Sequence, residues 1–388
     1  MFSERTNWEL ASNQLTTVLQ QLRHQNAKFY DLTESNPTQC GFIYPPEIVK
    51  ALANSSNLNY DPHAQGMQKA REAVCRYYQK KGIALDPHQV FLTTGTSEAY
   101  SFLFRLLLNP NEQALFPIPS YPLFQFLADL NDVRMENYPL GYHQGRWQID
   151  TKQMADKITS ESRAMVLVNP NNPTGSYIKS DEIAEINRLC KDHDLAIIAD
   201  EVFLDYSFEP QDLKPSSLAA NEQNLTFVLG GVSKALGLPQ MKLSWIVVNG
   251  PPSKIKDAKE RLEIIADTYL SVNTPVQNAL PGWCDFQNRI QNQIKERTRR
   301  NRDYILKNFS TGKALQCLHA EGGWYMVLKL LKQTDDESFA LQLLEEDQVY
   351  IHPGYFFDFT DGAYAVVSLI PPENIFQEGL KRLARRLA

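Results

Sequence analysis

Short apolar runs that end in a polar or glycine-rich turn recur through the middle of the chain, and segments with apolar residues at helical spacing stand between them. Such runs are typical of strands that are buried on both faces of a parallel sheet. The alternation of strands and helices predicts an α/β fold. Runs of this kind lie at residues 90–93, 163–168, 195–199 and 226–229, and the C-terminal segment repeats Phe376, Leu380, Leu383 and Leu387 at helical spacing.

One lysine stands at the end of an apolar run and before a loop that is rich in glycine and proline. Lys234 follows the strand expected at residues 226–229, and we expect a second buried parallel strand at residues 243–248. Open α/β sheets bind their ligands at the carboxyl ends of the strands. A loop lysine is, however, most often a solvent-exposed side chain. Whether Lys234 is a ligand-binding residue or an exposed one therefore depends on the residues in the neighbouring turns.

The turn after the strand at residues 90–93 is a candidate phosphate site. It contains Gly95, Thr96 and Ser97 and leads into a helix with one apolar face. The N-terminus of a helix offers free backbone N–H groups, which bind anions. Simple capping of the helix by Thr96 or Ser97 is the alternative.

Three further residues with suitable chemistry follow predicted strands. Tyr121, Asn172 and Asp200 each come just after an apolar run. Asn172 belongs to a turn that two Asn-Pro pairs hold rigid. A carboxylate at the end of an apolar strand is costly to bury without a partner. Asp200 therefore needs a cationic or protonated partner.

Length and composition narrow the class of protein. With 388 residues the chain exceeds one average domain, so we expect a large and a small domain. The net charge of −6 argues against a nucleic-acid partner, and the basic run at residues 295–302 is interpreted as an exposed helix face. The five cysteines show neither CxxC nor metal-ligand spacing, which fits a reducing cytosol and predicts no metal site. Without a signal-like segment or a long apolar run, we expect a cytoplasmic protein that does not enter a membrane.

Together, these groups suit a phosphorylated aromatic heterocycle that carries a ring nitrogen and an aldehyde. The chain resembles the fold-type I pyridoxal-phosphate enzymes, specifically the aminotransferase class I/II family. The strongest motifs are NPNNPTG at residues 169–175, DEVF at 200–203, and SK followed by a Gly/Pro loop at 233–239. Their order and spacing are far more specific than any one motif. The resemblance extends from Tyr60 to the EGLKRL segment at 378–383.

The resemblance implies the α/β fold of the pyridoxal-phosphate-dependent transferases. Residues 45–281 would form a large cofactor-binding domain with a mostly parallel, seven-stranded sheet flanked by helices. Residues 1–44 and 282–388 would form a smaller α+β domain, which includes a long helix at about residues 283–309. A homodimer is also implied, in which Tyr60 reaches the phosphate of the neighbouring subunit's site.

The resemblance further implies a role for each candidate residue. Lys234 would form the Schiff base with pyridoxal 5′-phosphate and later move a proton. Asp200 would keep the ring nitrogen protonated, because a nearby carboxylate favours the cation. Asn172 would donate a hydrogen bond to the ring oxygen, and Tyr121 would stack on the ring. The phosphate would be held by Gly95, Thr96, Ser97, Ser233 and Lys242.

Four positions depart from the common pattern of the family. Phe203 stands where a tyrosine usually binds the ring oxygen, and Gly231 stands where a phosphate-binding serine is frequent. Lys242 replaces an arginine and so lacks its bidentate fork. Val366 stands where an arginine normally clamps the substrate carboxylate, and residues 303–381 contain no arginine at all. The smaller domain therefore has no arginine in this range that could bind the substrate carboxylate through two hydrogen bonds.

We expect an aminotransferase that moves an amino group between an amino donor and a 2-oxo acid, with an atypical substrate anchor. Asn36, Asn172 and loop N–H groups are the candidates for binding the acid group. A decarboxylase or a C–S or β-eliminating lyase would use the same cofactor. A non-catalytic cofactor-binding module is a third hypothesis, which the presence of both Lys234 and Asp200 weakens. The sequence does not identify the substrate.

Overall fold

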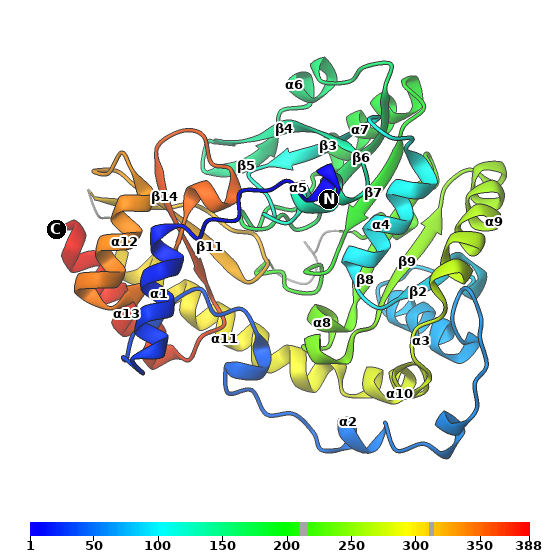
Figure 1. The fold of residues 1–388 in the computed structure, drawn as a ribbon, viewed down its shortest axis with the longest axis horizontal. Coiled ribbons are helices and arrows are strands. Elements are labelled where there is room, and N and C mark those ends of the chain that lie inside the picture. The colour runs from blue at the N-terminus through cyan, green and yellow to red at the C-terminus, as the bar shows by residue number, and fades with distance from the viewer. Residues whose placement is uncertain (210–215, 310–313) are drawn as a thin grey trace.

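The computed structural model describes residues 1–209, 216–309 and 314–388. Residues 210–215 belong to the predicted large domain and residues 310–313 to the predicted small domain, and both segments lie outside the described residues. The strands form one large sheet, a smaller antiparallel sheet and a two-stranded pair, with helices packed around them (Figure 1). This architecture confirms the predicted α/β fold, while the exact domain boundaries stay a prediction.

The large sheet is parallel at its centre and antiparallel at both edges. The parallel pairs run from β8 through β7, β6 and β3 to β4. The sheet has eight described strands rather than the expected seven, because β5 folds back on β4 through a tight turn in which Gln144 and Gly145 both have positive φ. In spatial order the strands are β2 (Val90–Thr93), β9 (Ser244–Asn249), β8 (Thr226–Gly231), β7 (Ala196–Asp200), β6 (Ser162–Val168), β3 (Gln113–Ile118), β4 (Arg134–His143) and β5 (Arg146–Ile149).

The expectation that residues 243–248 form a parallel strand is wrong. Strand β9 runs antiparallel to both of its neighbours, β8 and β2. Only the short helix α8 (Val232–Ala235) and the 3₁₀ turn η7 (Pro239–Met241) connect β8 to β9. A parallel pair needs a crossover of a dozen or more residues, usually with a full helix. The loop that carries Lys234 is therefore the connection between two antiparallel strands.

Helices cover both faces of the large sheet, so its central strands are buried on both sides. Alternate residues of β7 belong to different apolar clusters, with Ile197 and Ala199 on one face and Ala196 and Ile198 on the other. The first face packs against α3 (Gln68–Gln79), α6 (Thr151–Asp156), α7 (Ser180–Asp192) and α10 (Thr274–Asp285). The second packs against α4 (Thr96–Leu107), α5 (Phe124–Leu130) and α9 (Pro252–Tyr269).

The smaller sheet is antiparallel and comes from the C-terminal part of the chain, and a separate parallel pair of strands joins the N-terminal segment to that part. Strand β1 (Tyr30–Asp31) pairs with β12 (Val349–Tyr350), which ties the N-terminal segment to the C-terminal part. The long helix begins at Gln287 rather than near residue 283, because Trp283 belongs to α10. The sheet order is β10 (Leu315–Cys317), β11 (Tyr325–Leu330), β14 (Ala363–Ser368) and β13 (His352–Pro353). The remaining helices are α1 (Gln14–His24), α2 (Glu47–Lys50), α11 (Gln287–Phe309), α12 (Asp336–Asp347) and α13 (Glu373–Leu387).

No described helix has the length and apolar character needed to cross a bilayer.

Burial of the apolar face of α13 should contribute much of the stability of the part of the protein that contains the smaller sheet. Phe376 is fully buried in its core, so Phe376→Ala is expected to lower the free energy of unfolding by about 3–5 kcal/mol. Denaturant unfolding measures the change. Lys381→Ala, at an exposed position of the same helix, should shift it by no more than about 0.5 kcal/mol. Equal effects of the two substitutions would contradict this account of the core.

Candidate active site

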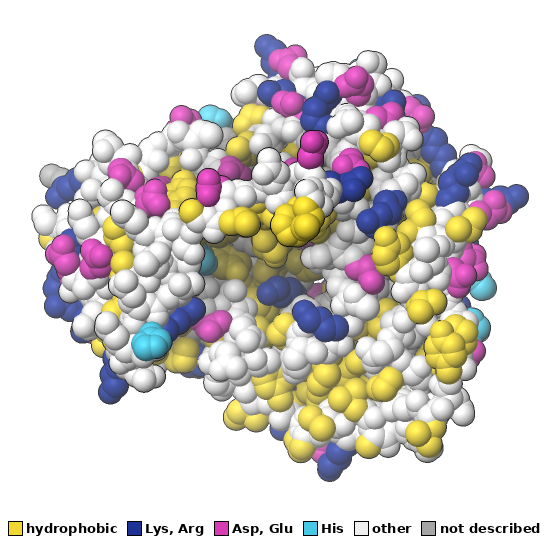
Figure 2. Space-filling model, in the orientation of Figure 1, with side chains coloured by type: hydrophobic (Ala, Val, Ile, Leu, Met, Phe, Trp, Pro, Cys, Tyr) yellow, Lys and Arg dark blue, Asp and Glu magenta, His cyan; other side chains and the backbone are white. Residues whose placement is uncertain are grey.

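One cavity of about 340 Å³ lies at the carboxyl ends of the central strands, and its volume is typical of small-molecule sites. The face of the molecule in Figure 2 is hollowed near its centre, with basic side chains at the edge of the hollow. All predicted site residues except Tyr60 and Asn36 line the cavity. They are Gly95, Thr96, Ser97, Tyr121, Asn172, Asp200, Ser233, Lys234 and Lys242.

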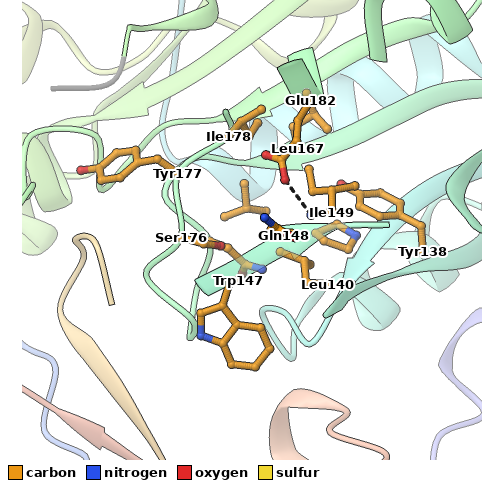
Figure 3. A pocket seen from close by; sticks show the side chains of 13 residues that line it. Tyr138, Leu140, Trp147, Gln148, Ile149, Leu167, Ser176, Tyr177, Ile178 and Glu182 are labelled. Carbon is orange, nitrogen blue, oxygen red and sulfur yellow. Dashed lines mark hydrogen bonds between the residues drawn. The ribbon is translucent and has the colours of Figure 1, made fainter. Parts of the chain in front are cut away.

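A second hollow, beside β5, is too small to hold a ligand. Its volume of about 10 Å³ leaves room for one water molecule at most. Figure 3 shows Tyr138, Leu140 and Trp147 around it, with the Glu182 carboxylate accepting a hydrogen bond from the Ile149 N–H at 2.8 Å. This carboxylate is engaged in holding α7 against β5, so the hollow is a gap in the packing rather than a site.

Lys234 lies on the single helical turn α8, directly after β8. The Tyr206 hydroxyl donates a hydrogen bond of 2.6 Å to the Lys234 carbonyl oxygen, which fixes this turn. The Lys234 Nζ lies 4.7 Å from the centre of the Trp324 ring and 5.3 Å from that of Phe203. Burial lowers the pKa of Lys234 to about 8, although the charge of Asp200 opposes this shift. A substantial share of the amine is therefore neutral near physiological pH.

Asp200 ends β7 and is buried beside the cavity. Its Oδ1 accepts a hydrogen bond from the Val202 N–H at 3.1 Å, and its Oδ2 accepts one from the Tyr100 hydroxyl at 3.2 Å. Burial raises the pKa of Asp200 to about 6, against the effect of these hydrogen bonds and of Lys234. In the described part of the chain Asp200 has no ion-pair partner, so it can favour a protonated group on a ligand.

Tyr100 is a site residue that the sequence analysis missed. It belongs to the helix that was expected, after the predicted phosphate turn, to have one apolar face, and that face is indeed buried. The hydrogen bond from its hydroxyl to Asp200 joins residues 100 positions apart in the chain. One sequence signal could have suggested this contact. It is a tyrosine at an apolar position of the helix that follows the predicted phosphate turn.

The opposite end of the cavity suits a phosphate. Helix α4 begins after Gly95 and has no side-chain cap, so the alternative of simple capping by Thr96 or Ser97 is not realised. Among the described residues, the hydroxyls of Thr96, Ser97 and Ser233 have no hydrogen-bond partner. Lys242, which has a left-handed backbone with φ of 48°, brings an ammonium group to the same cavity. Backbone N–H groups, hydroxyls and one cation thus meet at a helix N-terminus.

The loop at residues 35–40 contributes a different residue from the one expected. The Asn36 side chain caps the 3₁₀ turn η2 (Pro37–Gln39) by accepting a hydrogen bond from the Thr38 N–H at 3.1 Å, and Asn36 does not line the cavity. Its neighbour Ser35 does, together with Tyr325 from the smaller sheet. The local turn chemistry of an asparagine before proline therefore outweighs a role in ligand binding.

The position where the resemblance implied a carboxylate-clamping arginine is filled by apolar packing. Val366 is fully buried in a cluster with Leu140, Trp147 and Phe357 and does not line the cavity. Within the described ranges, Lys234 and Lys242 are the only lysine or arginine side chains that line the cavity. The site therefore has an amine, an acid and a phosphate-binding end, but no cation left for a second acid group.

The chain is similar to known aminotransferases both in sequence and in structure. The family model described as aminotransferase class I and II matches residues 18–368. The glutamate-pyruvate aminotransferase AlaA of Haemophilus influenzae is 29% identical over 95% of this chain and 92% of its own length. The alanine aminotransferase of Mycobacterium tuberculosis is 26% identical over 98% of this chain and 95% of its own. A crystal structure of an aminotransferase from Escherichia coli superimposes with a TM-score of 0.89 at 25% identity, covering 100% of this chain and 98% of that one.

The chain belongs to the aminotransferase class I and II family. It is a pyridoxal-phosphate-dependent aminotransferase, as its motifs predicted, and its substrates are small molecules with amino or keto groups. The residues present fit pyridoxal 5′-phosphate, because the Asn172 amide lines the cavity and makes no hydrogen bond, and Asp200 lacks an ion-pair partner, in the described part of the chain. Free hydroxyls beside Lys242 complete the fit at the phosphate end.

The lowered pKa of Lys234 predicts its reactivity in protein stripped of cofactor. Labelling of Lys234 by a small amine-reactive reagent should rise with pH around a midpoint near 8, whereas exposed lysines should follow a midpoint of about 10.4. Peptide mass spectrometry resolves the lysines. Because the Asp200 charge raises the pKa of Lys234, Asp200→Asn should move the midpoint to lower pH. A midpoint equal to that of the exposed lysines would contradict the described burial.

Proposed function

We propose that this aminotransferase moves an amino group between an amino donor and a 2-oxo acid whose acid group is held by neutral hydrogen-bond donors instead of an arginine. The observation that carries the proposal is the charge content of the cavity. Lys234 and Lys242 are its only cationic side chains among the described residues, and the bound cofactor would engage both. Val366 is buried in apolar packing at the position where the resemblance led us to expect the clamping arginine.

The proposed cofactor contacts follow from the chemistry of the lining. When bound, pyridoxal phosphate supplies an aldehyde that bonds to amines and a ring that withdraws electrons from the substrate carbon. Asp200 would hold a proton at the ring nitrogen, Asn172 would donate to the ring oxygen, and Tyr121 would pack against the ring. Since Phe203 has no hydroxyl to share the ring oxygen, Asn172 would act there alone. Lys242 would hold the phosphate with the N-terminus of α4 and the hydroxyls of Thr96, Ser97 and Ser233.

Lys234 would move the proton during amino transfer. Its pKa of about 8 lets Nζ accept a proton near neutral pH and release it again. The amine would take up the proton that leaves the substrate α-carbon and give it back when the amino group has been transferred. The hydrogen bond from Tyr206 to the Lys234 backbone supports this role, because it holds the turn while the side chain moves.

Neutral groups at the smaller sheet would bind the acid group of the substrate. Burial raises the pKa of Tyr325 to about 12, against the effect of a hydrogen bond with Ser35, so the phenol stays protonated and can donate. Ser35 and Asn172 line the same cavity. A hydrogen bond from a neutral donor to a carboxylate contributes about 1.5–3 kcal/mol, but it lacks the second charge and the bidentate geometry of an arginine. We therefore infer that the acid group contributes less to substrate selection than it would with an arginine clamp.

The names of the relatives suggest the first substrates to test. Two relatives are a glutamate-pyruvate aminotransferase and an alanine aminotransferase. We infer that alanine and glutamate are candidate donors and pyruvate a candidate acceptor, each bound without a charged clamp.

Replacing the acid group of the donor by an amide should therefore change the rate only modestly. A hydrogen bond to a charged group contributes about 1.5–3 kcal/mol and a neutral one about 0.5–1.5 kcal/mol, so kcat/KM for L-alanine should exceed that for L-alaninamide by no more than about ten- to a hundredfold. The measurement is conversion of the cofactor to its amine form, followed by absorbance. Tyr325→Phe should reduce kcat/KM for alanine more than for the amide. A preference for alanine of more than about a thousandfold would show a charged clamp, and release of ammonia or carbon dioxide without the amine form would contradict amino transfer.

A homodimer is part of the proposal. Tyr60 is 72% exposed and Leu58 is 90% exposed, and Ile43 and Val49 on the same segment are also exposed. Figure 2 shows apolar side chains gathered on the lower part of this face, where this segment and α10 run in Figure 1. Exposed apolar patches mark interaction surfaces, and Tyr60 is free to reach the site of a second subunit. The free cysteines of the described chain support a cytoplasmic location.

A hybrid dimer tests whether Tyr60 serves the neighbouring site. One subunit carries Lys234→Ala and the other Tyr60→Phe, so that exchange across the interface would leave one site with both residues intact. This site should show the wild-type kcat and KM. If Tyr60 serves its own chain, the hybrid will instead keep the lowered kinetics of the Tyr60→Phe homodimer, which serves as the matched control. If Tyr60 serves no site, that homodimer will itself show the wild-type kcat and KM.

A further inference from the structure

Ser244, the first residue of β9, occupies the space that a side chain on Gly231 would need. The two residues are register partners in the antiparallel pair of β8 and β9. A Cβ atom built on Gly231 would overlap the Ser244 hydroxyl, with the Ser244 Cβ only 3.1 Å away. Gly231 has an extended backbone with φ of −176°, which any residue adopts, so the absence of a side chain there is a matter of space rather than of backbone conformation.

The position of Ser244 in the sheet puts its hydroxyl between the two turns that form the phosphate end of the cavity. On one side Ser244 pairs with Thr93, whose strand leads to the N-terminus of α4. On the other side it pairs with Gly231, whose strand leads to Lys234. Ser244 also follows Lys242 by two residues and lines the same cavity as Lys242, Thr96, Ser97 and Ser233.

The Ser244 hydroxyl lines the cavity and has no hydrogen-bond partner among the described residues. The residue is 2% exposed, and in the described part of the chain its Oγ makes no hydrogen bond. A hydroxyl that is shielded from water and makes no hydrogen bond destabilises the fold, unless a ligand supplies the missing hydrogen-bond partner. Because Lys242 provides one ammonium instead of a planar fork, an anion at this end has room for a further neutral donor.

We propose that Ser244 binds the phosphate of the cofactor and supplies the hydroxyl that Gly231 lacks. The inference rests on the proposed placement of the phosphate beside Lys242. The hydroxyl donor would come from β9 instead of the facing position on β8, so the phosphate end has a hydroxyl here although Gly231 has no side chain.

Binding of two cofactor forms that differ in the phosphate tests the proposal. Pyridoxal phosphate and pyridoxal are titrated into the cofactor-free protein, and Kd is followed by tryptophan fluorescence, which the neighbouring Trp245 should report. Ser244→Ala should raise Kd for pyridoxal phosphate about ten- to a hundredfold, as for a lost hydrogen bond to a charged group. Kd for pyridoxal should stay within about twofold of the wild-type value. Unchanged Kd for both forms, or an equal loss for both, would overturn the proposal.

Three further variants make the outcome specific. Ser120→Ala removes a buried, unpartnered serine hydroxyl that does not line the cavity, and it should change neither Kd. The exchange Gly231→Ser with Ser244→Gly should restore the preference for the phosphate form, because it moves the hydroxyl back across the strand pair. Lys242→Ala should also weaken the phosphate form selectively. If Lys242→Ala is selective and Ser244→Ala is not, only the role of Ser244 is refuted; if neither is selective, the proposed phosphate site itself is wrong.

Discussion

The structure depends on an acid and an amine that are held, largely out of water, in the same cavity. Asp200 and Lys234 follow adjacent parallel strands, β7 and β8, whose faces are both covered by helices. Desolvation raises the pKa of Asp200 to about 6 and lowers that of Lys234 to about 8, so both shifts favour the neutral forms. Hydrogen bonds from Tyr100 and Val202 offset only part of this effect. The protein therefore presents a carboxylate that favours a protonated partner and an amine that can react and exchange protons near neutral pH.

The antiparallel strand β9 explains how the phosphate end can differ from the family pattern without losing its donors. Because β9 pairs with both β2 and β8, one residue at its start lies beside both of the turns that surround the phosphate end. A side chain on Gly231 would need the space that the Ser244 side chain fills, so a hydroxyl at this place can come from either strand but not from both. The substrate end shows no such replacement: Val366 belongs to an apolar cluster, and the groups that remain, Ser35 and Tyr325, are neutral.

The sequence allowed the backbone of the site to be predicted, but not its side-chain pairings. Apolar runs that end in Asp200 or Asn172 place these residues at strand ends, because a buried strand and the turn after it are both local features. The role of Tyr100, the overlap of Ser244 with Gly231, and the direction of β9 depend on how distant segments are arranged. Turn chemistry also misled the prediction at Asn36, whose side chain caps its own loop while Ser35 lines the cavity.

Reduction of the cofactor-loaded enzyme with borohydride, followed by peptide mapping, tests the central claim most directly. The account predicts a pyridoxyl group on Nζ of Lys234 and none on Lys242, although both lysines line the cavity. The buried, partly neutral amine is the one that can bond to an aldehyde, whereas the other lysine faces the phosphate. A pyridoxyl group on Lys242 or on any lysine outside the cavity would contradict the assignment of the site.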